Sequence, residues 1–203
     1  MNQSSMTKKQ LLIPNLNQKF KEILDEPSWI SLEESYKNCS RISFFGNGGN
    51  LAVADHAAID TSRLTNKLGL CPGSGILASS LINDKGHEKW LEKWVEITSR
   101  GLTEEIMKNS LFIGISSSGK SENVVAALNY ANFLGAKAFL ITASRIKTNQ
   151  EINFNYCDLG VDEYHSSEVF TLLLTYQLIH SCGFECPSIS KSSEPEDEIF
   201  SFK

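Results

Sequence analysis

The chain has 203 residues, a formal net charge of −5 at pH 7 and no long apolar run. This length predicts one domain with a substantial core, and the charge excludes a broad basic surface for nucleic acid. Because the sequence contains neither a membrane-length apolar segment nor a long apolar leader, we expect a cytoplasmic protein that binds no membrane. The five cysteines are odd in number and scattered, which is typical of reduced thiols.

Apolar periodicity predicts strands alternating with helices along the chain. Such alternation indicates an α/β fold with a doubly wound, mostly parallel sheet, in which ligands bind beyond the carboxyl ends of the strands. We expect one domain over residues 1–190 and a loose acidic tail over 191–203. The predicted elements are helical residues 16–38 with a break at Pro27, strand 41–45, helix 51–64, strand 76–82, helix 87–108, strand 111–115, helix 121–134, strand 137–142, strand 156–161 and helix 168–182.

The segment SLFIGISSSGKS at 110–121 supports two incompatible interpretations. Gly114 to Ser121 fits the nucleotide-binding pattern G-x-x-x-x-G-K-[ST], and it also fits a serine-rich loop for the phosphate of a sugar. In both cases a strand leads into a helix whose free N–H groups favour an anion. Phosphate binding is therefore predicted by either interpretation.

The nucleotide interpretation lacks its usual metal-binding partner. A mononucleotide site needs an apolar strand that ends in Asp or Glu to hold Mg²⁺. The strand over 138–143 ends without an acid, and Asp158 and Asp162 are weak substitutes. Gly114 also lies inside the predicted strand rather than at its end, so the sequence disfavours this interpretation.

A second strand-to-helix junction at Gly46-Asn-Gly-Gly-Asn50 favours the sugar phosphate. Gly48 and Gly49 allow positive φ angles and close approach to a ligand, and Asn47 and Asn50 offer amide groups. A tight turn alone would explain this segment equally well. Two such junctions in one α/β domain predict a site that holds both ends of a phosphorylated sugar.

With these two loops, His56 to Asp60 and Asn83 to Gly86, the chain resembles the sugar isomerase (SIS) domain family, and within it the phosphoheptose isomerases. The resemblance runs from about residue 15 to 183. It implies a flavodoxin-like three-layer α/β/α sandwich, a homotetramer with active sites at subunit interfaces, and isomerisation of sedoheptulose 7-phosphate for the heptose of lipopolysaccharide or capsule. A phosphosugar-binding protein without catalysis remains the alternative.

The resemblance also assigns residues to roles. The phosphate is expected at Ser116, Ser117, Ser118 and Ser121, with Lys120 either near it or in solvent. The sugar is expected at Asn47, Gly48, Gly49, Asn50, Asp84 and Ser167.

The catalytic residues match the family less well. Asp60 stands where the family has a Glu base, four residues beyond His56, and it is shorter by about 1.5 Å. Thr175 and Ser167 stand where the family has an acid His and a Gln, and neither hydroxyl can protonate an enediol at neutral pH. His180 or His165 is then the candidate acid, although His180 falls on a different helix face from Thr175.

Some family members bind zinc through the same four positions. Only His56 and Asp60 remain of that set here, and Ser and Thr are poor zinc ligands. Zinc is therefore a possibility carried by the resemblance, with an incomplete set of ligands.

Overall fold

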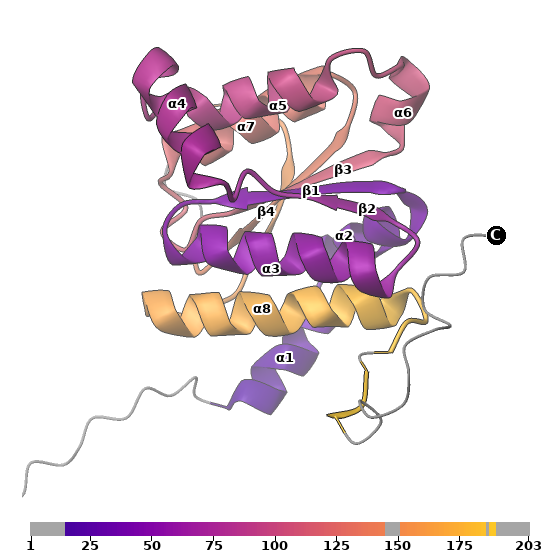
Figure 1. Cartoon of the computed structure of the whole chain (residues 1–203). Helices are drawn as coiled ribbons and strands as arrows, with labels where there is room; N and C mark the ends of the chain where they lie inside the picture. The colour runs from indigo at the N-terminus through magenta and orange to yellow at the C-terminus, as the bar shows by residue number, and fades with distance from the viewer. Residues whose placement is uncertain (1–14, 145–150, 186, 190–203) are drawn as a thin grey trace, which may run out of the picture.

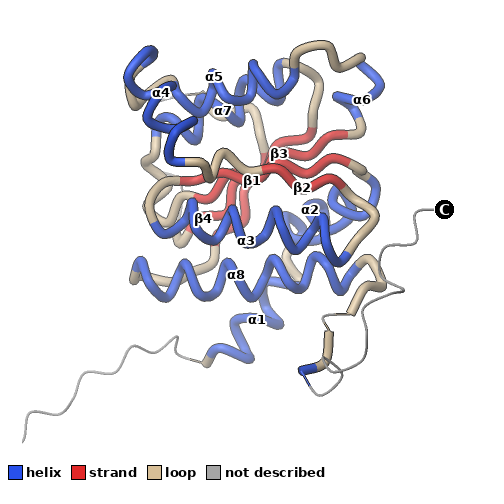
Figure 2. The backbone as a smooth tube through the Cα atoms, viewed as in Figure 1, coloured by secondary structure: helices blue, strands red, loops and turns tan. Residues whose placement is uncertain are grey.

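A computed structural model describes residues 15–144, 151–185 and 187–189; Cys186 and the predicted tail at 191–203 lie outside these ranges. The described strands form one parallel sheet between two layers of helices (Figures 1 and 2). Their order is β2-β1-β3-β4-β5, which is the flavodoxin-like order. The predicted three-layer parallel fold is confirmed. The strands are β1 (Arg41–Gly46), β2 (Leu68–Leu70), β3 (Ser110–Ile115), β4 (Lys137–Thr142) and β5 (Asn155–Asp158).

Each face of the sheet has its own apolar core. Trp29, Leu32 and Phe170 are fully buried on one face, while Phe45 and Leu128 are fully buried on the other. The strands between them read as continuous apolar runs because helices cover both faces. One layer contains α1 (Leu16–Leu24), α2 (Pro27–Asn38), α3 (Gly49–Leu64) and α8 (Tyr164–Ser181); the other contains α4 (Gly75–Lys85), α5 (Trp90–Ser99), α6 (Glu104–Lys108) and α7 (Glu122–Phe133) (Figure 1).

The predicted strand at 76–82 is wrong, because these residues belong to helix α4. A short apolar run cannot be assigned to strand or helix by periodicity alone. The strand that pairs with β1 is instead β2, which precedes α4 in the chain and has only three residues. Three residues are too few to give a recognisable strand pattern in the sequence.

Two other boundaries follow from backbone chemistry. Pro27 is the first residue of α2, so the predicted break within 16–38 is confirmed. The single helix predicted over 87–108 is instead α5 and α6, separated by a turn in which Gly101 has φ of 77°. This positive φ ends the first helix.

The sheet order fixes where a ligand can bind. β1 and β3 are adjacent and parallel, and the chain leaves β1 toward β2 on one side and β3 toward β4 on the other. The loops after these two strands therefore meet at the topological switch point. Along the part of the chain that the structure describes, no helix is both long and apolar enough to cross a membrane.

Candidate functional site

Two pairs of polar side chains join the glycine-rich loop to the serine-rich loop. The Asn50 amide donates to Ser117 Oγ at 3.0 Å, and both residues are buried. The amides of Asn47 and Asn123 exchange hydrogen bonds of 2.9 Å in both directions. The two loops thus lie side by side, and their asparagines connect them, which sequence reasoning had not predicted.

The serine-rich loop gathers hydroxyls at the start of α7. Ser116 Oγ donates to Ser121 Oγ at 2.9 Å, and the Lys120 N–H donates to Ser118 Oγ at 3.2 Å. Ser121 is the N-cap of α7 and its side chain makes no capping hydrogen bond. The dipole of this 12-residue helix adds a positive field at the same place. The loop can therefore hold an anion with hydroxyls and N–H groups.

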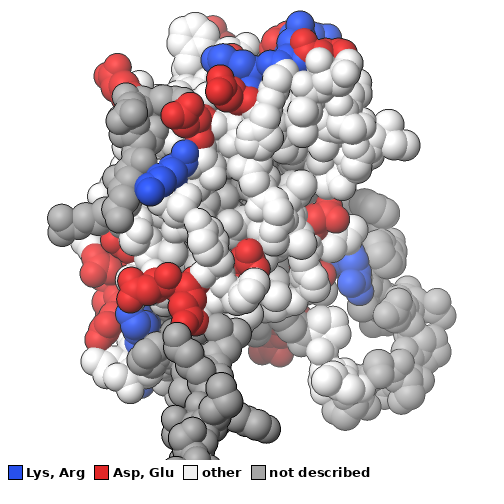
Figure 3. Space-filling model, turned by 90° about the vertical axis from the view of Figure 1, so that its left-hand side faces the viewer, with Lys and Arg blue, Asp and Glu red and all other residues white. Residues whose placement is uncertain are grey.

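A cavity of about 240 Å³ opens beside this loop, lined by Ser117, Ser118, Lys120, Ser144 and the segment 162–164. Lys120 lines this cavity, and it is also exposed to solvent. Figure 3 looks onto the side of the molecule at which the strands end, and its centre is mostly uncharged with few scattered Lys and Arg. A phosphate here would depend on hydroxyls, N–H groups and Lys120 rather than on a basic cluster.

Glu168 is a functional candidate that sequence reasoning missed. Gly48 adopts a positive φ of 56°, and a Cβ on Gly49 would lie 2.3 Å from Glu168 Oε1. The carboxylate of this α8 residue therefore lies directly against the first residue of α3, where a negative charge is favourable. His165 Nδ1 is 3.7 Å from the same carboxylate. The sequence signal was only a Glu beside Ser167 at the start of the last helix.

His56 and Asp60 lie together on one face of α3, one turn apart. His56 Nε2 is 3.0 Å from Asp60 Oδ2, and Arg63 Nη1 is 3.6 Å from Asp60 Oδ1. Asp60 is buried, whereas the side chains of His56 and Arg63 are about half exposed. A carboxylate held between a histidine and an arginine in this way can accept and return a proton.

Helix α8 lies along α3 and completes this environment. Ser167 and Thr175 are buried, and Thr175 Oγ1 donates to the Leu172 carbonyl at 2.7 Å. Tyr176 Oη instead lies 2.7 Å from His56 Nε2. Sequence reasoning missed this tyrosine, because its partner is 120 residues away in the chain.

A cavity of about 550 Å³ lies between α3 and α8, lined by Asp60, Arg63, Leu64, Tyr176, His180 and Pro187. The structure therefore places His180 on the same cavity as Asp60, although His180 lies far from Thr175 around the helix. His165 lies near the other end of α8, beside Glu168.

The donor set does not fit a zinc ion. Within the described ranges, no third His, Cys, Asp or Glu joins His56 and Asp60 in a group that could hold a metal. The Thr175 hydroxyl is already bonded to a backbone carbonyl, and Ser is a poor zinc ligand. We therefore derive no step through a metal.

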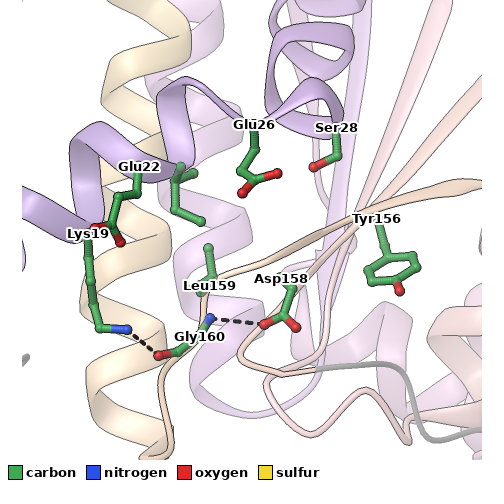
Figure 4. A pocket seen from close by; sticks show the side chains of 9 residues that line it. Lys19, Glu22, Glu26, Ser28, Tyr156, Asp158, Leu159 and Gly160 are labelled. Atoms are coloured by element: carbon green, nitrogen blue, oxygen red, sulfur yellow. Dashed lines mark hydrogen bonds between the residues drawn. The ribbon is translucent and has the colours of Figure 1, made fainter.

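Two further features lie apart from these loops. Asp84 is exposed near the end of α4, where Asn83 donates to it at 3.1 Å, and no described contact joins it to either loop. A cavity of about 430 Å³ between α1 and the end of β5 contains Glu22, Glu26 and Asp158 against one lysine, Lys19 (Figure 4). This excess of carboxylates disfavours a phosphate.

The nucleotide interpretation gains no support from these positions. Gly114 pairs with Phe45 and Leu140 inside β3, so it does not begin the loop. Asp158 Oδ1 accepts a hydrogen bond of 2.9 Å from the Gly160 N–H, turned toward the α1 cavity (Figure 4). Asp162 does line the cavity beside Ser118 and Lys120.

Comparison with known proteins finds similarity to phosphoheptose isomerases, although no family model matches the chain. The phosphoheptose isomerase of Aliarcobacter butzleri is 36% identical over 128 residues, covering 60% of this chain and 63% of that protein. The one from Aquifex aeolicus is 34% identical over 113 residues, covering 52% of this chain and 55% of that protein. The matches thus span less than two thirds of either relative.

The structural similarity is more extensive. The structure of a phosphoheptose isomerase from Neisseria gonorrhoeae aligns with a TM-score of 0.66 at 20% identity, covering 83% of this chain and 91% of that one. This protein therefore has the fold of a solved phosphoheptose isomerase, and over part of its length it is similar in sequence to phosphoheptose isomerases.

Proposed function

We propose that the protein is a phosphosugar isomerase that interconverts a ketose and an aldose phosphate, with sedoheptulose 7-phosphate as its substrate. The observation that carries the proposal is the His56–Asp60 pair, whose Asp60 lines a sugar-sized cavity in a fold shared with phosphoheptose isomerases. The hydroxyl-rich loop at the switch point supports phosphate binding. The relatives' names favour a heptose as the sugar.

In this reaction Asp60 acts as the base. Its carboxylate removes a proton from C1 of the ketose, which gives a cis-enediol, and returns a proton to C2 to give the aldose. Burial limits the access of water to this proton, while His56 and Arg63 hold the two carboxylate oxygens. A second group must donate a proton to the C2 oxygen.

We further propose a homotetramer in the cytoplasm that serves lipopolysaccharide or capsule heptose synthesis. From Asn50 to Asp60, α3 rises about 15 Å. An extended seven-carbon sugar phosphate measures only about 10 Å from phosphorus to C1 at ordinary bond lengths. An active site at a subunit interface would let the serine loop of one copy serve the Asp60 cavity of another.

A phosphosugar-binding protein without catalysis is the second candidate. The observation that favours it is Thr175, whose hydroxyl is buried and bonded to Leu172 where the resemblance expects an acid. The same loops would then bind a sugar phosphate and release it unchanged.

An assay on sedoheptulose 7-phosphate separates the two candidates. We expect turnover by the wild-type protein and a loss of about 100-fold or more in kcat for Asp60→Asn, which keeps the shape but removes the base. Asp25→Asn, at the exposed end of α1, is the matched control. Absence of turnover together with tight sugar phosphate binding would favour the binding protein. Mg²⁺-ATP binding that is lost in Lys120→Ala would instead revive the nucleotide interpretation.

A further inference from the structure

The residue after Thr175 is turned toward the catalytic pair. Thr175 is buried and its hydroxyl donates to Leu172, so it faces its own helix. The Tyr176 ring meets the His56 ring edge-on, with centroids 5.9 Å apart and planes at 89°. This packing holds the Tyr176 hydroxyl 2.7 Å from His56 Nε2.

A single nitrogen therefore faces two oxygens. His56 Nε2 lies 2.7 Å from Tyr176 Oη and 3.0 Å from Asp60 Oδ2. An ionised Asp60 only accepts hydrogen bonds, so it favours the form of His56 that carries a proton on Nε2. That N–H then points at both oxygens. The phenol oxygen becomes an acceptor and its own proton is directed away from the ring of His56.

The same arrangement places the phenol close to the base. Because the Tyr176 and Asp60 oxygens lie 2.7 Å and 3.0 Å from one nitrogen, they are less than about 6 Å apart. Tyr176 and Asp60 also line the same cavity, together with Arg63 and His180. In the isomerisation, the oxygen on C2 and the proton on C1 are attached to neighbouring carbons. A phenol and a carboxylate at this separation can reach one each.

We propose that Tyr176 is the general acid of this site, in place of the histidine that the Thr175 position lacks. This inference rests on the proposed isomerase function. When Asp60 takes the proton from C1, the C1–C2 double bond forms and the Tyr176 O–H donates its proton to the C2 oxygen. The resulting phenolate, stabilised by the His56 N–H, then takes the proton of the C1 hydroxyl. Asp60 returns its proton to C2, and the aldose leaves with both residues restored.

Tyr176→Phe tests the proposal because it keeps the ring against His56 and removes only the hydroxyl. We expect kcat on sedoheptulose 7-phosphate to fall about 100-fold or more with little change in KM. Tyr130→Phe, on α7 in the opposite layer, is the matched control and should retain wild-type rates. Thermal unfolding of both variants verifies that they fold.

The pH profile supplies a readout that a structural role would not move. Activity of the wild type should fall at high pH as the phenol loses its proton. Replacing Tyr176 by 3,5-difluorotyrosine, a stronger acid, should move this fall to lower pH. His56 contacts the phenol, and Asp60, Arg63 and His180 line the same cavity in both proteins, so the comparison isolates the substituted ring.

The outcomes separate this inference from the proposed function. If the wild type does not isomerise the sugar, the proposed function fails and this inference fails with it. If the wild type turns over and Tyr176→Phe stays within about twofold, or the difluorotyrosine protein keeps the wild-type profile, the function stands and Tyr176 is not the acid. A large loss in His180→Ala with none in Tyr176→Phe would assign the acid to His180.

Discussion

At the scale of single residues, Gly49 has no room for a side chain because the Glu168 carboxylate lies against it. A Cβ at position 49 would lie 2.3 Å from one carboxylate oxygen of Glu168 and 2.6 Å from the other. Because these atoms are the far end of a flexible side chain, we expect Gly49→Ala to push Glu168 off its preferred rotamer and to lower the free energy of unfolding by about 0.5–1.5 kcal/mol. Chemical denaturation of the variant measures this effect.

A matched glycine and a double variant control for helix propensity. Gly75 is also the first residue of its helix, and a Cβ there would meet nothing within 4 Å, so Gly75→Ala should be neutral or stabilising. Glu168→Ala removes the obstructing carboxylate and should relieve most of the cost of Gly49→Ala. If Gly49→Ala is as harmless as Gly75→Ala, Glu168 does not lie against the glycine loop.

The sequence predicted those site residues whose partners are near in the chain. His56 and Asp60 are one helical turn apart, so their pairing follows from periodicity alone. Tyr176 and Glu168 reach the site from a helix more than a hundred residues away, and no local pattern marks that docking. Asp84 is exposed on α4 without a described contact to either loop, so its place in the sugar site stays a prediction.

At the scale of elements, β5 contributes a buried thiol, Cys157, to the core. Burial raises the pKa of Cys157 to about 12; Glu26 adds to this, and a hydrogen bond with Ser28 opposes it. The folded protein therefore keeps this thiol protonated at a pH where the unfolded chain, with an ordinary pKa near 9.0, ionises. The stabilisation is complete below pH 9 and is lost as the pH rises toward 12.

This pH dependence is tested by comparing the wild type with Cys157→Ala. The difference in their free energies of unfolding should shrink by about 1.4 kcal/mol between pH 8 and pH 10, because the variant has no thiol to ionise. Val161→Ala, a nearby buried deletion without a titrating group, should show a pH-independent difference. A constant difference for Cys157→Ala would mean that the thiol ionises in the folded state.

The strands and helices also differ in how well their apolar patterns predict them. The long apolar runs of β1, β3 and β4 were predicted because both of their faces are covered. The edge strand β2 has three residues and no such signal, and the helix α4 beside it has an apolar run that resembles a strand. Short elements depend on their neighbours for their conformation, so tertiary context decided both.

At the scale of the whole molecule, the α3–α8 layer carries apolar side chains that the described chain leaves in solvent. Val169 and Leu173 lie one turn apart on α8 with 59% and 37% exposure, and Ile59 of α3 is 54% exposed. Exposed apolar side chains that follow one another along a helix mark a surface that associates. With a chain mass of 22.6 kDa, we expect the wild type to sediment as a tetramer.

The double variant Val169→Asp with Leu173→Asp should dissociate this assembly, because each charge would have to be buried at the interface. If the serine loop of one copy serves the Asp60 cavity of another, isomerase activity should fall with the tetramer, as sedimentation and turnover at matched concentrations would show. Phe133→Asp is the control, since this 80% exposed side chain lies on α7 in the other layer. Full activity of a dissociated double variant would instead mean that each protomer forms a complete site. The phosphate loop and Asp60 of one chain would then bind the same sugar.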